Sequence, residues 1–282
     1  PTADQRRVMR ELIGLSTRLV VMSHKGAEFL KGVYKAPAGK IDVICHGIPE
    51  TAFVDPSYYK DHFGVEGKKV LLTFGLLSPN KGIEVMLNAL PKIAAEHPDV
   101  VYIILGATHP HLLREVGESY RLSLELLAEK NGVKKNVIFY NRFVELAELK
   151  EFIGAADVYI TPYLNEAQIS SGTLAYSFGS GKAVVSTPYW HAVELLADGR
   201  GVLVPFNDSA ALAREVAALL ADDARRNAMR KSAYKLGREM VWGNVAGSYM
   251  RSFERARNER AGLARKLVTV KTLDKQLKGL PE

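Results

Sequence analysis

The sequence predicts an α/β protein in which a parallel β-sheet carries helices on both faces. Two observations lead to this prediction. Apolar runs alternate with amphipathic helical segments through most of the 282 residues. The runs are continuously apolar, which is typical of strands that are buried on both faces. Because ligands of such sheets bind beyond the carboxyl ends of the strands, a site is expected in the segments that follow strands.

Eight apolar runs are predicted to be strands and the segments between them helices. The strands are 18–22, 41–45, 69–74, 100–105, 136–140, 158–161, 183–186 and 201–204. The helices lie near 2–14, 24–34, 81–96, 109–130, 145–155, 171–180, 190–197 and 208–221, with long amphipathic helices from 222 to 257. Residues 266–273 are predicted to form a strand or an extended tail.

Composition narrows the class of protein. Hydrophobic residues make up 47% of the chain and charged residues 24%, which is ordinary for a soluble α/β protein. No apolar stretch reaches the length of a membrane span, and the polar N-terminus does not resemble a signal peptide. Cys45 is the single cysteine, so an internal disulfide and a thiolate metal cluster are excluded. A cytoplasmic protein is expected.

The net charge of +7 is concentrated at the C-terminal end. Residues 251–282 contain nine Lys and Arg against four Asp and Glu, which is five of the seven net positive charges. Such an end is compatible with a solvated or docking helix, or with weak contact with an anionic membrane. Nucleic acid is not an expected partner, because no recognition module accompanies the charge.

A glycine-bounded loop, Gly75-Leu-Leu-Ser-Pro-Asn-Lys-Gly82, follows the strand 69–74 and precedes a helix. The start of a helix presents unpaired N–H groups and a partial positive charge. Gly75 lets the backbone approach a ligand closely, and Lys81 adds a full charge. The loop is therefore compatible with a diphosphate site, and equally with an ordinary turn that carries a surface lysine.

A second polar segment follows the strand 158–161 and favours the first interpretation. Six polar residues cluster before a helix: Asn165, Glu166, Gln168, Ser170, Ser171 and Thr173. Helix capping accounts for one of them but not for all six. Two such helix starts beside one crevice would suit a ligand with phosphates at one end and hydroxyls at the other.

The motifs occur in an order that resembles the C-terminal half of a GT-B glycosyltransferase of the retaining family-4 (group 1) type. The resemblance covers about residues 41–245. The matching segments are His46-Gly-Ile-Pro49, Phe74-Gly-Leu-Leu-Ser-Pro-Asn-Lys-Gly82, Ala155-Ala-Asp-Val-Tyr-Ile-Thr-Pro162, Gly181-Lys-Ala-Val-Val-Ser-Thr187, and Glu194 before Asp198-Gly-Arg-Gly-Val-Leu-Val204. The resemblance implies a Rossmann-like domain over 41–245, preceded at 1–40 by the end of an N-terminal GT-B domain. It also implies that 246–282 forms a crossover helix and basic tail.

Three positions depart from the family pattern. Leu76 stands where the family has an arginine beside the diphosphate. Gln168 and Tyr176 stand where it has two glutamates, and Glu166 serves as the sugar-facing carboxylate only if the loop is shifted by two residues. Tyr176 cannot chelate a ribose diol as a carboxylate does.

The resemblance implies transfer of a hexose from a nucleotide diphosphate sugar to a hydroxyl of a carbohydrate or lipid-linked acceptor, with retention. Lys81 and Glu166 are the expected catalytic residues; no cofactor or metal is expected beyond the donor. The residues expected to contact the donor are Gly75, Leu76, Ser78, Asn80, Asn141, Arg142, Asn165, Gln168, Ser170, Ser171, Gly172, Thr173 and Tyr176. The acceptor site would belong to the missing N-terminal GT-B domain, and this chain alone can be inactive. The alternatives are a degenerate non-catalytic module of a larger chain, or a sugar-nucleotide epimerase or phosphorylase on the same fold.

Overall fold

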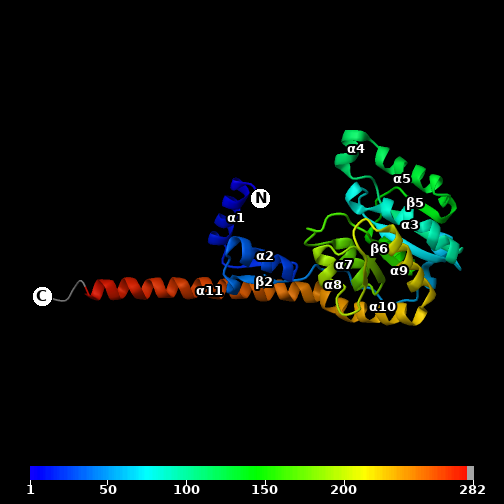
Figure 1. Ribbon diagram of the computed structural model, residues 1–282. Coiled ribbons are helices and arrows are strands. Elements are labelled where there is room, and N and C mark those ends of the chain that lie inside the picture. The colour runs from blue at the N-terminus through cyan, green and yellow to red at the C-terminus, as the bar shows by residue number, and fades with distance from the viewer. Residues whose placement is uncertain (278–282) are drawn as a thin grey trace. The chain divides into compact units, whose positions relative to one another are not determined.

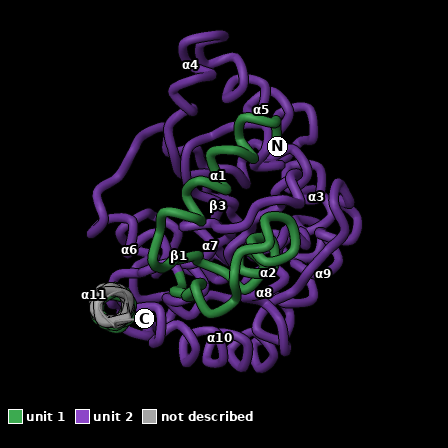
Figure 2. Tube along the Cα trace, turned by 90° about the vertical axis from the view of Figure 1, so that its left-hand side faces the viewer, with its two compact units in different colours: residues 1–45, 243–282 green, residues 46–242 purple. Residues whose placement is uncertain are grey.

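The structure, a computed structural model, describes the backbone of residues 1–277 and the side chains of residues 1–262. The chain divides into two compact units (Figures 1 and 2). The larger unit is residues 46–242, and the smaller one joins residues 1–45 to the segment from residue 243 onward. The sequence analysis placed the domain boundaries at 40/41 and 245/246.

The larger unit contains a six-stranded parallel sheet in the order β5-β4-β3-β6-β7-β8. The strands are β3 (Lys69–Phe74), β4 (Val100–Leu105), β5 (Val137–Tyr140), β6 (Val158–Thr161), β7 (Ala183–Ser186) and β8 (Val202–Leu203). β3 pairs with β4 along its whole length, from Lys69 opposite Val100 to Phe74 opposite Leu105. On its other side β3 pairs with β6, so the direction of strand addition reverses between β3 and β6.

Helices cover both faces of this sheet, as predicted. The helices are α3 (Ile83–Glu96), α4 (Pro110–Val116), α5 (Ser119–Lys130), α6 (Leu146–Ala155), α7 (Gly172–Gly179), α8 (Trp190–Leu195), α9 (Ser209–Ala221) and α10 (Asp223–Gly237), with short 3-10 turns at Pro56–Tyr59, Asp61–Phe63, Pro79–Lys81, Lys134–Asn136 and Arg238–Met240. On one face, α3, α5 and α9 pack a core that includes Leu90, Leu124 and Leu212 against the sheet. On the other face, Phe152 of α6 and Phe178 of α7 are fully buried.

Two secondary-structure predictions need correction. The segment 109–130 was expected to be one helix, but it forms α4 and α5, which are separated by Gly117 in a left-handed conformation (φ 61°). Residues 266–273 were expected to be a strand or an extended tail, whereas the backbone of α11 (Trp242–Leu277) is helical throughout this range. The predicted membrane contact of the basic end depends largely on side chains that lie outside the described residues.

The smaller unit has a two-stranded parallel sheet of β1 (Leu19–Val21) and β2 (Ile41–Val43). It also contains α1 (Ala3–Leu15), α2 (His24–Tyr34), a 3-10 turn at Ala38–Lys40, and α11. Asp42 of β2 is buried and accepts hydrogen bonds from Arg18 and from Ser252 of α11. β2, which the sequence assigned to the donor-binding domain, thus pairs with β1. Among the described helices of both units, none is long and apolar enough to cross a membrane.

Candidate functional site

The candidate site lies at the carboxyl ends of β3 and β6, where the order of strand addition reverses. Such a switch point leaves a crevice between two loops that diverge to opposite faces of the sheet. The loop after β3 begins at Gly75, whose N–H donates to Leu105 O at 2.9 Å. Leu77 continues this pairing with Ala107 O at 2.9 Å, so the loop is held along the extension of β4.

Lys81 reaches the crevice from a 3-10 turn (Pro79–Lys81) rather than from the first turn of α3. Gly82 follows it in a left-handed conformation (φ 62°), and a Cβ at this position would lie 2.0 Å from Pro162 O. Gly82 and Ile83, which begin α3, are buried. The sequence therefore placed Lys81 correctly beside a helix, but the turn presents its side chain and the start of α3 is covered.

Four groups converge on the crevice. The Lys81 ammonium donates to the hydroxyl of Tyr163 and lies 4.4 Å from the centre of its ring. The same hydroxyl is 2.9 Å from Oγ1 of Thr173 in α7. A Cβ added to Gly75 would lie 3.2 Å from both Lys81 Nζ and Thr173 Cγ2. Because Gly75 has no Cβ, a narrow space remains between its backbone, the Lys81 ammonium and the Thr173 methyl group.

The hydroxyls at the start of α7 form a second edge of this space. Ser171 is the N-cap of α7, and its Oγ accepts the N–H of Leu174 at 3.3 Å. Thr173 Oγ1 lies 3.2 Å from Ser171 Oγ. The N–H groups of the first helical turn and these hydroxyls are donors of the kind that bind anions at helix N-termini.

Tyr163 is buried, and burial by itself would raise the pKa of its hydroxyl. The positive charge of Lys81 and its hydrogen bond outweigh burial and leave the pKa of Tyr163 below its ordinary value. The pair therefore places a strongly polarised hydroxyl between the ammonium and Thr173. The sequence analysis missed Tyr163, although it comes directly after Pro162 in the motif that ends β6.

His191 of α8 forms a hydrogen bond with the start of α7. Its Nδ1 accepts the backbone N–H of Ser171 at 2.9 Å, and the backbone N–H of His191 donates to Gln168 O at 3.1 Å. Burial, with a smaller contribution from His46, lowers the pKa of His191 to about 4. The imidazole is therefore neutral at pH 7 and acts as an acceptor. The sequence analysis also missed this residue.

Acidification is expected to destabilise the protein through His191. Its folded-state pKa lies below the ordinary value of 6.5, so the stabilisation is complete above pH 6.5 and is lost as the pH falls toward 4. A shift of this size corresponds to about 3 kcal/mol. Urea unfolding at pH 7 and pH 4.5 should show a smaller loss of stability for His191→Gln, whose amide oxygen accepts the same N–H without titrating. Equal losses in both proteins would contradict this assignment.

The other predicted residues contact neighbouring loops or His46. Ser78 and Asn80 contribute backbone carbonyls, which accept the N–H groups of Lys81 and Leu164 at 2.9 and 3.0 Å. Gln168 Nε2 donates to Ser170 O at 2.6 Å. Tyr176 packs its ring edge-on against His46, with 6.0 Å between the centroids.

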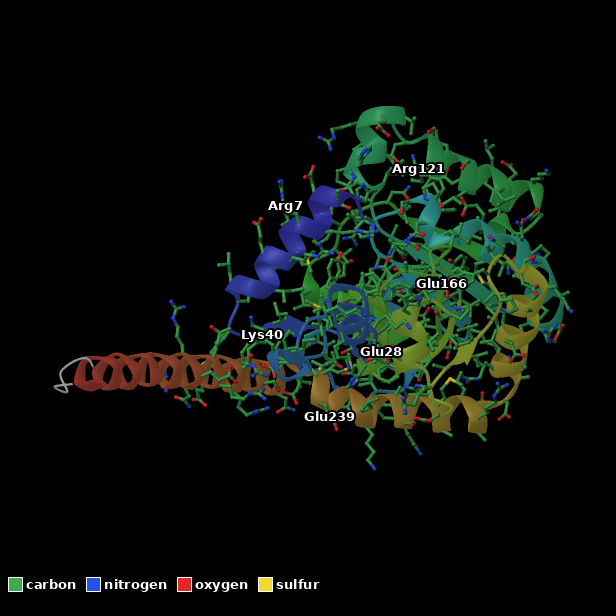
Figure 3. The ribbon with its side chains drawn as sticks, turned by 60° about the vertical axis from the view of Figure 1, so that its left-hand side comes forward. Arg7, Glu28, Lys40, Arg121, Glu166 and Glu239 are labelled. Carbon is green, nitrogen blue, oxygen red and sulfur yellow. The ribbon has the colours of Figure 1, made fainter. Side chains whose placement is uncertain are left out.

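Asn165 and Glu166 are exposed on the loop before α7. The side chain of Asn165 accepts the N–H of Ala167 at 3.0 Å. Glu166 is labelled in Figure 3. Its backbone carbonyl accepts the N–H of Trp190 at 3.0 Å, which ties the loop to α8. This bond holds the Glu166 backbone, from which the exposed side chain extends.

An apolar recess borders the crevice on the β4 side. Its lining consists of Phe74, Gly75, Leu76, Leu105, Gly106, Ala107, Arg142, Phe143, Val144 and Leu149. Leu76 is 39% exposed and Phe143 is 79% exposed. Asn141 and Arg142 are exposed as well, and the Arg142 guanidinium pairs with Glu148, Nη1 to Oε2 at 2.8 Å. The recess offers apolar contacts beside the space that Lys81 and Thr173 border.

Comparison with known proteins places these features in a family. Residues 54–236 match the family described as "Glycosyl transferases group 1". A phosphatidyl-myo-inositol mannosyltransferase of Mycolicibacterium smegmatis is 29% identical over 212 residues, which is 75% of this chain and 51% of that protein. A D-inositol 3-phosphate glycosyltransferase of Xylanimonas cellulosilytica is 28% identical over 269 residues, 91% of this chain and 61% of that protein. The chain thus spans about half to three fifths of the length of these relatives.

Solved structures share the fold. A glycosyltransferase from Rickettsia africae superposes with a TM-score of 0.76 at 15% identity, covering 91% of this chain and 68% of that one. Anabaena HepE, crystallised with UDP and glucose, superposes with a TM-score of 0.70 at 20% identity, covering 89% and 66%. The family match covers well over half of the chain and includes both loops of the crevice. The chain belongs to the group 1 glycosyltransferases and has the Rossmann-like α/β architecture of GT-B enzymes.

Proposed function

We propose that residues 46–242 form the donor-binding half of a glycosyltransferase that uses a nucleotide diphosphate sugar. The observation that carries the proposal is the convergence of the Lys81 ammonium, the Gly75 backbone and the Thr173 hydroxyl at the strand switch point. A diphosphate bound in the crevice beside them would meet one full positive charge and the donors at the start of α7. These groups would stabilise the negative charge that grows on the diphosphate as the glycosidic bond breaks.

The remaining parts of a donor would extend to either side of this crevice. The apolar recess beside Phe74, Leu76 and Phe143 suits the flat face of a base. Arg142 belongs to its lining, and Asn141 precedes it in the chain. On the other side, Asn165, Glu166 and Gln168 lie on the loop that leads to α7 and would orient the sugar. In this assignment Lys81 and Glu166 are the catalytic residues, and the sugar is a hexose that is transferred with retention.

The relatives guide the proposal for the acceptor. Those named above are a phosphatidyl-myo-inositol mannosyltransferase and a D-inositol 3-phosphate glycosyltransferase. We propose an acceptor hydroxyl on a carbohydrate or a lipid-linked molecule, bound by an N-terminal GT-B domain. In this proposal sugar transfer depends on both domains.

One observation favours a second candidate, a donor-like domain without catalysis. The exposed Leu76 offers no charge beside the crevice where the family resemblance predicts an arginine, and Tyr176 packs against His46 where a carboxylate is expected. Such a domain would keep the fold and dock partners or regulate a larger chain. Nucleotide binding separates the two candidates.

Calorimetric titration of the purified chain with UDP, GDP and ADP tests the proposal. One nucleotide is expected to bind, and Lys81→Ala should weaken that binding by at least about ten-fold through loss of a charge-assisted contact. Lys92→Ala, an exposed lysine on α3, is the matched control and should bind as the parent protein does. If a folded parent protein binds none of the three nucleotides, the non-catalytic candidate is favoured. If binding is equal in Lys81→Ala, the site is misplaced.

A further inference from the structure

A polar cavity lies at the opposite end of the parallel strands, where β6 and β7 begin. It has a volume of about 250 Å³. Its lining consists of Glu50, Thr51, Ala52, Val54, Tyr59, Lys150, Gly154, Ser180 and Lys182. A water molecule occupies about 30 Å³ in the liquid, so this volume holds a small ion together with several waters. Nothing in the proposed donor site uses these residues.

Lys182 is the most unusual residue of this cavity because its side chain is 1% exposed. Its ammonium donates to two backbone carbonyls at the end of α6, Gly154 O at 2.7 Å and Ala156 O at 3.2 Å. These carbonyls carry the partial negative charge of a helix C-terminus, which is less than a full counter-charge. An ammonium has three N–H groups, so one N–H remains for the cavity that Lys182 lines.

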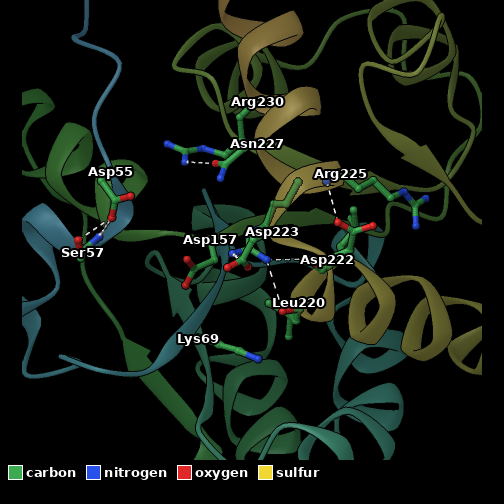
Figure 4. A network of polar contacts seen from close by, with 12 residues as sticks. Asp55, Ser57, Lys69, Asp157, Leu220, Asp222, Asp223, Arg225, Asn227 and Arg230 are labelled. Atoms are coloured by element: carbon green, nitrogen blue, oxygen red, sulfur yellow. Dashed lines mark hydrogen bonds and ion pairs between the residues drawn. The ribbon is translucent and has the colours of Figure 1, made fainter.

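The surroundings of Lys182 contain more buried positive charge than negative charge. Arg230 is also buried (4% exposed), and it donates to neutral oxygens, namely Gly181 O at 3.1 Å, Val54 O, and Asn227 Oδ1 at 3.0 Å (Figure 4). The buried carboxylate Asp157 is already paired with Lys60 at 2.8 Å. A buried charge is costly unless it is paired. The buried side chains around Lys182 therefore carry more positive than negative charge, and the carboxylate of the lining, Glu50, is exposed.

The protonation of Lys182 reflects this deficit. Burial lowers its pKa to about 7; Arg230 and Lys60 act in the same direction, and Asp157 and Asp55 act in the opposite direction. An anion in the cavity would favour the charged form and raise the pKa again. Binding of an anion would therefore be accompanied by proton uptake near neutral pH.

From the cavity and the unbalanced buried cations, we propose that this pocket binds a small oxyanion, either free phosphate or sulfate or the phosphate of a small phosphorylated molecule. Lys182 would supply a buried charge, and Lys150 a second charge at the lining. The hydroxyls of Thr51 and Ser180, which are 3.3 Å apart, would supply further hydrogen bonds. The site would be separate from the donor crevice, since its residues precede β6 and β7 whereas the crevice follows β3 and β6.

Calorimetric titration with sodium sulfate tests this proposal. The full chain carrying Lys81→Ala is the starting protein, so that sulfate binding at the donor crevice is weakened in every sample. Saturable binding is expected. Lys182→Met, which keeps the length of the side chain without its charge, should weaken binding at least about ten-fold. Lys150→Ala, at a less buried position, should weaken it by a smaller factor, and Lys92→Ala should leave it unchanged.

Several outcomes would overturn the proposal. They are the absence of saturable binding in a folded sample, equal binding in Lys182→Met, and, if Lys182→Met does not fold, equal binding in Lys150→Ala. Sulfate does not titrate between pH 6 and 8, so its affinity should fall over this range as Lys182 loses its proton. A flat profile would also contradict the proposal.

Titration with glycerol 3-phosphate then distinguishes a free ion from a phosphorylated molecule. Tighter binding than that of inorganic phosphate identifies a phosphorylated molecule as the ligand.

Discussion

Gly106→Ala is expected to lower the free energy of unfolding by about 3 kcal/mol or more and to abolish nucleotide binding. Gly106 follows β4 with a φ of 148°, and a Cβ at this position would lie 2.0 Å from Gly75 O. That oxygen belongs to the backbone of the donor loop, so no flexible side chain can move aside. Strain from an unfavourable φ adds to the overlap. Urea unfolding and nucleotide titration of the same samples measure both effects.

Gly132→Ala is the matched control for this prediction. Gly132 also has a positive φ, 69°, but no atom lies within 4 Å of the Cβ that would be added. Its replacement should cost only the conformational strain, about 1 to 2 kcal/mol, and should leave nucleotide binding intact. If the two variants lost equal stability and both still bound nucleotide, close packing of the Gly75 and Gly106 loops would not be what shapes the crevice.

The strands of the sheet could be predicted because their burial is written locally in the sequence. All six residues of β4, for example, are apolar or aromatic and at most 8% exposed, so the run from Val100 to Leu105 has no polar interruption. The ends of helices were harder to predict. Gly117 breaks a pattern that remains amphipathic on both sides, and a glycine inside a helix costs only about 1 kcal/mol, so the sequence alone did not indicate a break.

The segment 266–273 shows the opposite error. The segment was predicted to be a strand or an extended tail, and it contains the β-branched run Val268-Thr-Val270, which favours extended backbone. The helical penalty of such residues is only some tenths of a kcal/mol each, and extending an existing helix requires no new nucleation. A helix that already runs from Trp242 therefore continues through them.

The residues of the candidate site also differ in how far the sequence could predict them. Gly75, Lys81, Ser171 and Thr173 could be predicted as candidates because a loop between a strand and a helix has a local signature, and the structure brings them together. Tyr163 was not found, since its role depends on Lys81, 82 residues earlier in the chain. His191 reaches Ser171 across 20 residues and was missed for the same reason. Residues that support a site through long-range contacts leave no spacing that sequence analysis can detect.

Asp157→Ala is expected to destabilise the larger unit by about 3 to 5 kcal/mol, the typical loss when one partner of a buried ion pair is removed. Asp157 Oδ2 accepts the ammonium of Lys60 at 2.8 Å and the N–H of Val70 at 2.7 Å, and both Asp157 and Lys60 are less than 10% exposed. Its removal leaves the buried Lys60 ammonium with only the neutral acceptor Lys68 O. It also leaves the N–H of Val70, at the start of β3, without this acceptor. Urea unfolding followed by circular dichroism measures the loss.

Two further variants show whether the ion pair itself is responsible. Glu129→Ala removes the partner of Lys134 in an exposed pair of 3.3 Å and should cost at most about 1 kcal/mol. In the double variant Lys60→Met/Asp157→Leu the uncompensated charge is gone, so most of the stability lost in Asp157→Ala should return. If the double variant is no more stable than Asp157→Ala, the carboxylate acts mainly through the N–H of Val70, and Lys60 contributes to the corner by packing rather than by charge.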